Sequence, residues 1–297
     1  MKVRERSKES WEFEEGAEIV PGRHALAMLG GGYRYEVYLA WDERLHTVVA
    51  LKLLRPDRVD DVSSLRRFRT EADALDRLQH PVLPRCFGVQ LDGPHPHLVL
   101  EFLEGPRLST LIRKQKALAI EQVIPLALQL CSALHYMGAE DMVHLDVKPK
   151  NIIMGGPPRL VDLSIAAALE RAREIVGPVG TDAYMAPEQC DEETHPGIDY
   201  RTDMWGLGVT MYEAIAGRLP YPRGEGDAEG TDRFPQLVAE VDPLPRDIPA
   251  VLTEPVMACL ERRPADRPTA AELAATLQPL ADVLPRRPRL GRRRPRI

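Results

Sequence analysis

The stretch "VHLDVKPKNIIM", residues 143–154, sets a group of polar side chains between two apolar runs. The apolar residues on either side indicate a loop whose two ends are buried. Asp146 and Asn151, five positions apart on this loop, can point toward one pocket. Lys148 lies between them, and Leu145 stands inside the polar set, although a charged neighbour would be expected there. The stretch therefore predicts a polar pocket built on a loop.

A third oxygen-bearing side chain follows in "RLVD", residues 159–162, which brings Asp162 to the end of the next short strand. Taken singly, Asp146, Asn151 or Asp162 would also suit a helix cap or a turn. Around one cavity, their oxygens are hard ligands suited to Mg²⁺, which prefers carboxylates together with the phosphates of a substrate. The three residues together predict a magnesium site.

Upstream, residues 24–56 show the pattern of strand, glycine-rich turn, strand, short turn and strand, which predicts a small antiparallel sheet. Gly30, Gly31 and Gly32 by themselves also suit an ordinary hairpin turn. Their place between two strands, rather than between a strand and a helix, argues against a Rossmann or Walker loop. It favours a hairpin that covers phosphate groups.

Residues 63–81 predict a helix, with serines available as N-terminal caps and Pro81 after its end. Its apolar face consists of Leu65, Phe68, Ala72, Leu75 and Leu78. Glu71 falls inside this apolar arc and not on the wet face, so its carboxylate needs a cation. Lys52 alternates along the strand "VVALK" with one buried face, and it needs an anion for the same reason. We expect the two to pair, and to leave Lys52 donors free for a phosphate unless the pair is purely structural.

Beyond this region the pattern becomes mainly helical. Residues 97–105 predict a buried strand that ends in a glycine turn, and residues 120–143 and 201–217 predict two long helices, the second closed by Gly217. The predicted fold class is α+β. A small antiparallel-sheet lobe with one helix precedes a larger, mainly helical lobe.

These segments together resemble the protein kinase family, and the resemblance runs from about residue 22 to about residue 282. The motifs that carry it are "LGGGYRYEVY" for the glycine-rich loop, "VALK" for the strand lysine, "HLDVKPKN" for the catalytic loop, "DLS" for the metal-binding triplet and "GTDAYMAPE" for the end of the activation segment. Asp203 resembles the buried helix aspartate of the family. Arg267 resembles the family's arginine that pairs with the glutamate at the Glu188 position. The resemblance implies a two-lobed kinase fold. The expected divisions are a lead-in (1–21), an N-lobe (22–103), a C-lobe (104–282) and a basic tail (283–297).

The resemblance also implies that ATP and Mg²⁺ bind between the lobes. Lys52, held by Glu71, would bind the α- and β-phosphates, and Asn151 and Asp162 would hold the metal. Adenine would bind backbone groups of Glu101 and Leu103. The other residues implied around the nucleotide are Leu29, Gly30, Gly32, Val37, Ala50 and Leu100.

For the catalytic step, the resemblance implies that Asp146 orients and deprotonates the acceptor hydroxyl. Lys148 would neutralise charge on the phosphoryl group during transfer. A lysine at this position, together with Thr181, resembles the serine/threonine branch of the family, and the bacterial type fits best. The substrate implied is therefore a protein. His144, between two apolar residues, is interpreted as a packing residue.

Three positions depart from the family pattern. Tyr35 replaces the third loop glycine, so that the loop approaches phosphate less freely and an aromatic lid over the site is expected. The triplet at Asp162 has Leu163 and Ser164 for phenylalanine and glycine, which restricts its backbone. Leu145 replaces the catalytic-loop arginine.

The arginine missing at position 145 is accompanied by a second absence, because residues 165–180 contain no Ser, Thr or Tyr. In kinases with arginine at the Leu145 position, that arginine binds a phosphate on the activation segment. Here the receptor for the phosphate and the sites that would carry it are missing together. We therefore expect a kinase that is active without phosphorylation of this segment, which would be held by Thr181, by apolar packing and by Glu188 with Arg267.

Two other functions remain open at this level. A pseudokinase scaffold would bind a nucleotide or a partner without phosphoryl transfer. A small-molecule kinase of the aminoglycoside type shares the His-x-Asp and Asn spacing, but that group lacks the "GTDAYMAPE" segment and the pair of Glu188 and Arg267, which shape a peptide-docking surface.

Composition bounds the cellular setting. The chain has 297 residues, of which 44% are hydrophobic and 28% charged, and its four cysteines form no C-x-x-C pair. Neither a zinc site nor a disulfide framework is indicated, and the first residues lack the apolar stretch of a signal peptide. These features predict a cytoplasmic protein.

Charge is distributed unevenly along the chain. The net charge is -6, but the final "PRRPRLGRRRPRI" carries seven arginines and no acid, which leaves -13 for the rest (-6 minus 7). The tail suits an anionic membrane surface, nucleic acid or an acidic partner, and it also suits a solvated end.

Deleting residues 286–297 should leave catalysis unchanged, because no catalytic motif lies there. It should weaken binding to anionic vesicles or to RNA at low salt, measured by co-sedimentation and by filter binding. Failure of the intact protein to bind either would favour a solvated tail.

Overall fold

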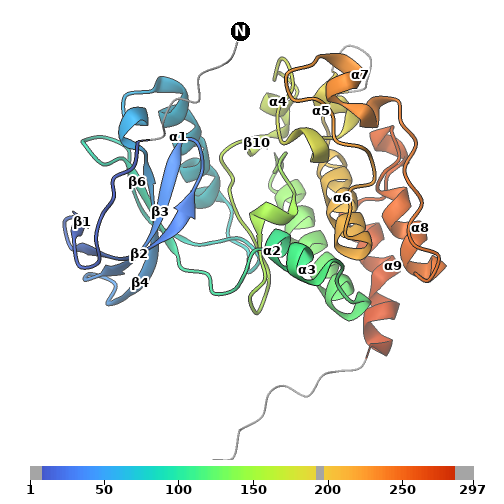
Figure 1. Ribbon diagram of the computed structural model, residues 1–297, viewed down its shortest axis with the longest axis horizontal. Helices are drawn as coiled ribbons and strands as arrows, with labels where there is room; N and C mark the ends of the chain where they lie inside the picture. Colours follow the sequence, from blue (N-terminus) through green and yellow to red (C-terminus); the bar gives the residue numbers. More distant parts are fainter. Residues whose placement is uncertain (1–8, 192–196, 285–297) are drawn as a thin grey trace, which may run out of the picture.

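The computed structural model describes residues 9–191 and 197–284, which form a sheet-containing lobe beside a larger helical lobe (Figure 1). Of the basic tail expected at 283–297, residues 285–297 lie outside the described residues. Among those described, no helix combines the length and the apolar character needed to cross a membrane.

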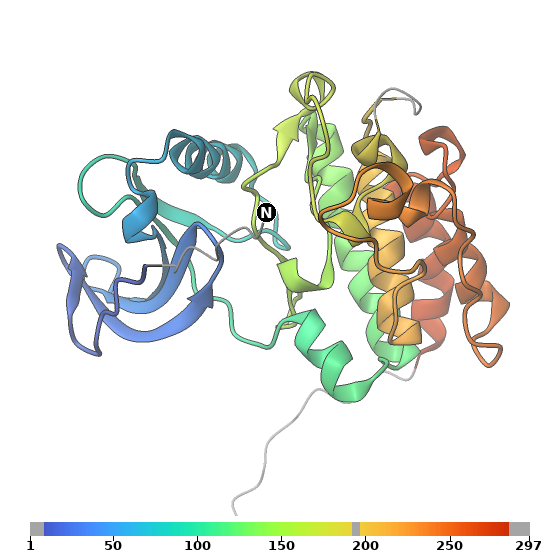
Figure 2. The same ribbon diagram turned by 45° about the horizontal axis from the view of Figure 1, so that its top comes forward.

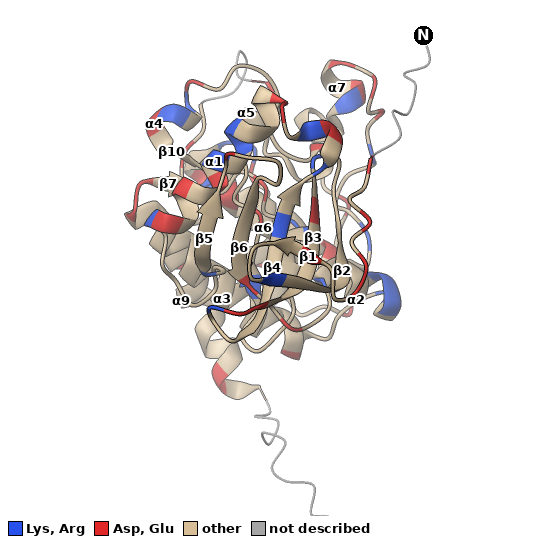
Figure 3. Cartoon of the chain, turned by 90° about the vertical axis from the view of Figure 1, so that its left-hand side faces the viewer, with Lys and Arg blue, Asp and Glu red and all other residues tan. Residues whose placement is uncertain are grey.

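On the side of the molecule seen in Figure 3, acidic and basic segments alternate, so neither sign of charge covers that side.

Within the described residues, the N-lobe sheet has six strands in the order β1-β2-β3-β4-β6-β5, and all neighbouring strands are antiparallel. The strands are β1 (Glu18–Val20), β2 (Arg23–Gly31), β3 (Tyr35–Asp42), β4 (Thr47–Leu54), β5 (Cys86–Gln90) and β6 (His97–Glu101). In β3 every second residue is buried, which places Tyr35 and Val37 on the face opposite Glu36 and Tyr38. The predicted antiparallel sheet is confirmed, and β5 is a strand that the pattern did not indicate.

The glycine-rich turn is shorter than expected, because β2 runs through Gly30 and Gly31 and the turn itself is residues 32–34. A Cβ atom on Gly31 would lie 2.5 Å from the carbonyl oxygen of Tyr35. No side chain fits at that distance. The hairpin is therefore closed by a close backbone approach that only glycine permits.

Residues 9–20, within the expected lead-in, pack against the N-lobe. Trp11 donates its indole N–H to the carbonyl of Leu54 at 2.7 Å, and its backbone N–H to Glu36 at 3.2 Å. Ile19 and Val20 are buried in the same apolar cluster as the sheet. The N-lobe core thus includes residues that precede the matched kinase motifs.

Helix α1 (Val62–Arg77) covers the predicted segment but is capped differently. Asp61, not a serine, is the N-cap, and its carboxylate accepts the backbone N–H of Ser64. Glu71 lies on the buried face with Phe68 and Ala72, as the helical spacing predicted. The link from β6 to α2 (Leu108–Gln115) joins the two lobes (Figure 2).

The C-lobe is built around α3 (Ile120–Ala139), which packs against α6 and α9. Its other helices are α4 (Leu169–Ala172), α5 (Pro187–Cys190), α6 (Thr202–Ala216), α7 (Gly230–Arg233), α8 (Ala250–Ala258) and α9 (Ala270–Val283). Its short strands form two pairs, β7 (Met142–Val143) with β10 (Ala167–Ala168) and β8 (Ile152–Ile153) with β9 (Arg159–Leu160). Gly217 ends α6 with a φ of 69°, as predicted, and a Cβ there would lie 1.8 Å from the carbonyl oxygen of Lys116.

A buried ion pair anchors α5 to the rest of the C-lobe. Arg267 donates from two guanidinium nitrogens to the two carboxylate oxygens of Glu188, at 2.6 and 2.8 Å, and both side chains are inaccessible to solvent. Thr202 adds a hydrogen bond to Glu188 at 2.8 Å, and the Arg267 guanidinium lies 5.1 Å from the centre of the Trp205 ring. The pairing expected from the sequence is confirmed.

Replacing Arg267 by methionine should lower the free energy of unfolding by about 3–5 kcal/mol, because it leaves the Glu188 carboxylate buried without its cation. Arg218→Met is a matched control. Arg218 also pairs with a carboxylate, Asp242, and lies over a ring, Tyr212, but in an exposed pair that contributes about 0–1 kcal/mol. Urea unfolding of the two variants should separate them, and equal losses would contradict the assigned role of burial.

Candidate active site

Two adjoining cavities lie between the lobes. The first, of about 340 Å³, is lined by nine of the ten residues expected around the nucleotide: Leu29, Gly30, Val37, Ala50, Lys52, Glu71, Leu100, Glu101 and Leu103. The tenth, Gly32, lines the second cavity, of about 220 Å³, together with Lys148 and Asn151. Tyr35, Lys52 and Asp162 line both cavities and therefore stand where the two meet.

Lys52 pairs with two carboxylates at the place where the two cavities meet. Its ammonium lies 2.5 Å from Glu71 of α1 and 3.3 Å from Asp162 of the C-lobe. Burial by itself lowers the pKa of Lys52, but the carboxylates of Asp162 and Glu71 outweigh it and raise the pKa above its ordinary value. The predicted pairing of Lys52 with Glu71 is confirmed, and Lys52 remains a cation.

Asp162 connects this centre to the C-lobe. It follows β9, and its φ of 71° is unusual for a residue other than glycine. One carboxylate oxygen accepts from Lys52, and the other accepts the hydroxyl of Tyr35 at 3.0 Å. Burial raises the pKa of Asp162, but Lys52 and the hydroxyls of Ser164 and Tyr35 outweigh this effect and hold the pKa well below its usual range. The carboxylate is therefore ionised.

The loop that carries Asp146 is bound to α6 through the side chain of Asp203. The Asp203 carboxylate accepts the backbone N–H groups of His144 and Leu145, both at 2.7 Å. Leu145 has a φ of 65°, a conformation that costs about 1 kcal/mol or more in a residue other than glycine. His144 is buried, and its Nδ1 accepts the backbone N–H of Asp146, which agrees with its interpretation as a packing residue. The loop geometry thus depends on one buried carboxylate.

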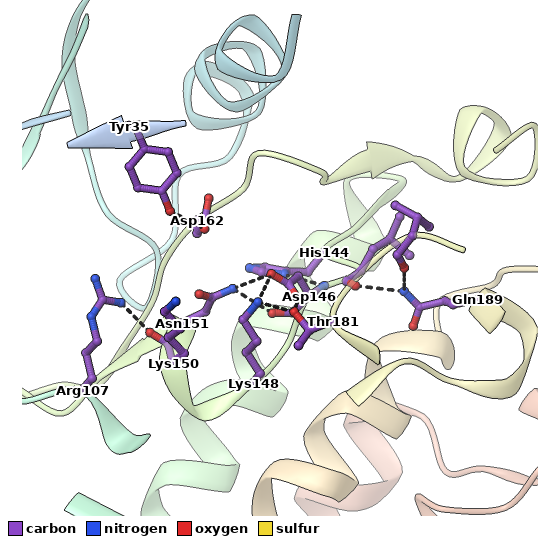
Figure 4. Close-up of polar contacts among 12 residues, drawn as sticks. Tyr35, Arg107, His144, Asp146, Lys148, Lys150, Asn151, Asp162, Thr181 and Gln189 are labelled. Atoms are coloured by element: carbon purple, nitrogen blue, oxygen red, sulfur yellow. Dashed lines mark hydrogen bonds and ion pairs between the residues drawn. The ribbon is translucent and has the colours of Figure 1, made fainter. Parts of the chain in front are cut away.

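Three side chains converge on the carboxylate of Asp146 (Figure 4). Lys148 donates to one oxygen at 2.5 Å, and Asn151 donates to the same oxygen at 2.9 Å. Thr181 donates its hydroxyl to the other oxygen at 2.7 Å, and Lys148 also donates to the Thr181 hydroxyl. The carboxylate is thereby fixed in orientation between the loop and the end of the activation segment.

Leu145 is buried in an apolar cluster that joins the loop to the activation segment. The other members of this cluster are Val143, Ile165, Ala167, Leu169, Ala172, Ile175, Val179 and Ile198. Gln189 of α5 donates to the carbonyls of Leu145 and Val179, at 2.9 and 2.8 Å. Strand β10 of the segment also pairs with β7. Apolar contact and backbone bonds therefore hold the segment where the family pattern would place an arginine.

Two residues of the site, Arg107 and Arg159, were not found from the sequence, and a third, Tyr35, lies differently from what was expected. Arg107 lines both cavities and donates to the carbonyl of Lys150. It belongs to none of the motifs identified in the sequence. Arg159 makes two hydrogen bonds to the Glu101 carboxylate, at 3.0 and 3.1 Å, which ties that side chain to β9. Tyr35 was expected to cover the site, but it points into the site between the two cavities.

The oxygens of Asn151 and Asp162 suit Mg²⁺, which binds one or two protein ligands together with phosphate oxygens. The described residues contain no cluster of three or more His, Cys, Asp or Glu that would bind a metal without a substrate. The donor set at the second cavity therefore fits a magnesium ion that is shared with a phosphate group.

Comparison with known proteins agrees with this geometry. Residues 23–277 match the protein kinase domain family. The chain is 33% identical over 266 residues to the serine/threonine-protein kinase PknB of Mycolicibacterium smegmatis, a match that covers 84% of this chain and 41% of that protein. It is 30% identical over 283 residues to a probable serine/threonine-protein kinase of Corynebacterium efficiens, covering 89% of this chain and 42% of that protein.

The matched region thus spans less than half the length of these relatives, which are longer proteins. The family match extends over most of this chain, through both lobes and all the motifs described above. The chain belongs to the protein kinase family.

Proposed function

We propose that this chain is an ATP-dependent protein serine/threonine kinase that transfers the γ-phosphoryl group to hydroxyls of protein substrates. The observation that carries the proposal is the carboxylate of Asp146, which Lys148, Asn151 and Thr181 hold in one orientation. The names of the bacterial relatives support the same activity.

At the nucleotide end, the apolar side chains of Leu29, Val37, Ala50 and Leu100 suit the faces of adenine, and the backbone of Glu101 and Leu103 suits its edge. Gly30 and Gly32 allow the β2–β3 hairpin to cover the phosphates. When bound, MgATP supplies the phosphoryl group, and its metal neutralises phosphate charge. Lys52 would hold the α- and β-phosphates, and Asn151 and Asp162 would hold the metal.

At the acceptor end, Asp146 would orient the substrate hydroxyl and accept its proton. Its carboxylate suits this role because three donors fix its orientation while 12% of the side chain stays exposed. Lys148, next to Asp146, would place a positive charge beside the transferred group. Thr181 connects this pair to the activation segment, so that the order of the segment controls the orientation of the base.

Neither alternative function gains support from the structure. The residues expected for nucleotide, metal and proton transfer lie around the two cavities and the adjoining loop, so no residue in the described part of the chain favours a pseudokinase. The ordered segment that ends at Glu188 and the buried pair with Arg267 suit a peptide-binding surface, and they disfavour a small-molecule kinase.

We further propose that the kinase is active without phosphorylation of its activation segment. The apolar cluster around Leu145, the β7–β10 pair and the hydrogen bonds of Gln189 support the proposal, because they order the segment without a phosphate. Arginine at position 145 would be a buried cation in this cluster. We also propose a C-lobe at 104–282 and a cytoplasmic location. The N-lobe proposed at 22–103 is extended by β1, which pairs with β2.

Lys52→Met and Asp162→Asn should each lower kcat/KM by about 100-fold or more, since each removes a charge that positions the phosphates or the metal. The loss should appear in the rate far more than in the melting temperature. Magnesium-dependent transfer of labelled phosphate to a generic protein substrate measures it, with the exposed Lys114→Met as control. Full activity in either variant would contradict the proposed mechanism.

Protein treated with a phosphatase should keep its rate on an exogenous substrate, because packing rather than phosphate orders the segment. Mass spectrometry should find no phosphorylated site between Ile165 and Gly180. A large loss of rate after treatment, restored by autophosphorylation, would overturn this part of the proposal.

A further inference from the structure

Tyr35 contacts both charged groups at the boundary of the two cavities. Its hydroxyl donates to Asp162 at 3.0 Å, and the ammonium of Lys52 lies 3.9 Å from the centre of its ring. Figure 4 shows the hydroxyl directed at Asp162 from the start of β3. A tyrosine hydroxyl is protonated at neutral pH, so it is the donor in this hydrogen bond. A tyrosine thus lies where the two charged side chains meet.

These contacts involve the groups that the proposed function assigns to phosphate and metal. An ammonium has three N–H donors, and that of Lys52 faces Glu71, Asp162 and the Tyr35 ring. The Asp162 carboxylate accepts from Lys52 on one oxygen and from Tyr35 on the other. A phosphate on Lys52 and a metal on Asp162 would therefore compete with the two contacts that Tyr35 makes with these groups.

The backbone at Tyr35 is fixed, so the side chain is the part that can move. The carbonyl of Tyr35 accepts the N–H of Gly32 at 2.9 Å, and the next residue, Glu36, is buried and paired with Arg55 at 2.6 Å. Arg55 also donates to the carbonyl of Gly32 at 2.9 Å. A rotation about the side-chain bonds of Tyr35 therefore frees Lys52 and Asp162 without breaking the sheet.

We infer that Tyr35 is an internal competitor of the magnesium nucleotide, holding Lys52 and Asp162 until phosphate and metal displace it. The inference rests on the proposed function and adds a regulatory residue to it. A hydrogen bond to an ionised carboxylate corresponds to about a tenfold change in an equilibrium constant, and a cation over a ring corresponds to a several-fold change. Binding of MgADP therefore competes with two contacts that can be removed separately.

Isothermal titration calorimetry on the full chain tests this with three ligands: MgADP, ADP in EDTA, and adenosine. Tyr35→Phe removes only the hydroxyl, so MgADP should bind about tenfold tighter and at lower Mg²⁺ concentration. Tyr35→Leu also removes the ring, so ADP in EDTA should bind severalfold tighter as well. Adenosine, which has no phosphate, should bind within about twofold of wild type in both variants.

Tyr33→Phe is the matched control. Tyr33 lies on the same hairpin, and its hydroxyl and ring both contact the cation Arg58, but it is exposed and does not contact Lys52 or Asp162. Its affinity for MgADP should equal that of wild type. An equal gain in Tyr33→Phe and Tyr35→Phe would point to loosening of the hairpin and would overturn the inference.

The remaining outcomes separate this inference from the proposed function. Unchanged MgADP affinity in Tyr35→Phe would sink the inference alone, provided that wild type binds MgADP. Weaker binding would also sink it, because the hydroxyl would then position Asp162 for the metal. If neither wild type nor Tyr35→Phe binds MgADP, the proposed function and the inference both fail.

Discussion

The buried ammonium of Lys52 is the interaction on which the arrangement of the two lobes depends. A cation that is only 4% exposed is tolerated only with anionic partners, and this one takes Glu71 from α1 and Asp162 from the C-lobe. The pairing fixes the rotation of α1 against the sheet and brings the end of β9 to the cleft. One desolvated charge thus connects the strand, the helix and the opposite lobe at the place where nucleotide phosphates are proposed to bind.

In the C-lobe, one buried carboxylate and an apolar cluster hold the loop and the activation segment in place. Asp203 accepts the backbone N–H groups of His144 and Leu145. The side chain of Leu145 packs in an apolar cluster that includes residues of the activation segment. Leucine in the left-handed conformation is unfavourable by itself, and the two short hydrogen bonds to a buried carboxylate compensate for it. Burial of apolar surface therefore contributes to the order of the segment, which supports the proposed activity without phosphorylation of the segment.

Much of the site followed from periodicity and polarity. The helical spacing placed Glu71 inside an apolar face, and the strand alternation placed Lys52 on a buried one, so their pairing could be expected from the energetic cost of leaving either alone. The two-lobed fold and the residues proposed to surround the nucleotide came from the resemblance of the motifs to the protein kinase family. The turn at residues 32–34 and the cap at Asp61 were placed less well, because element ends depend on single hydrogen bonds.

The sequence by itself determined which residues carry charge, that Lys52 and Glu71 lie on buried faces, and that Leu145 and residues 165–180 lack the groups for phosphate control. Only the tertiary structure decided where the side chain of Tyr35 points. Its hydroxyl partner lies 127 positions along the chain, and no local pattern reports a contact between residues so far apart. The same holds for Arg159 with Glu101, and for Trp11 with Glu36, because the distance between such residues is set by the packing of whole elements and not by their neighbours in sequence.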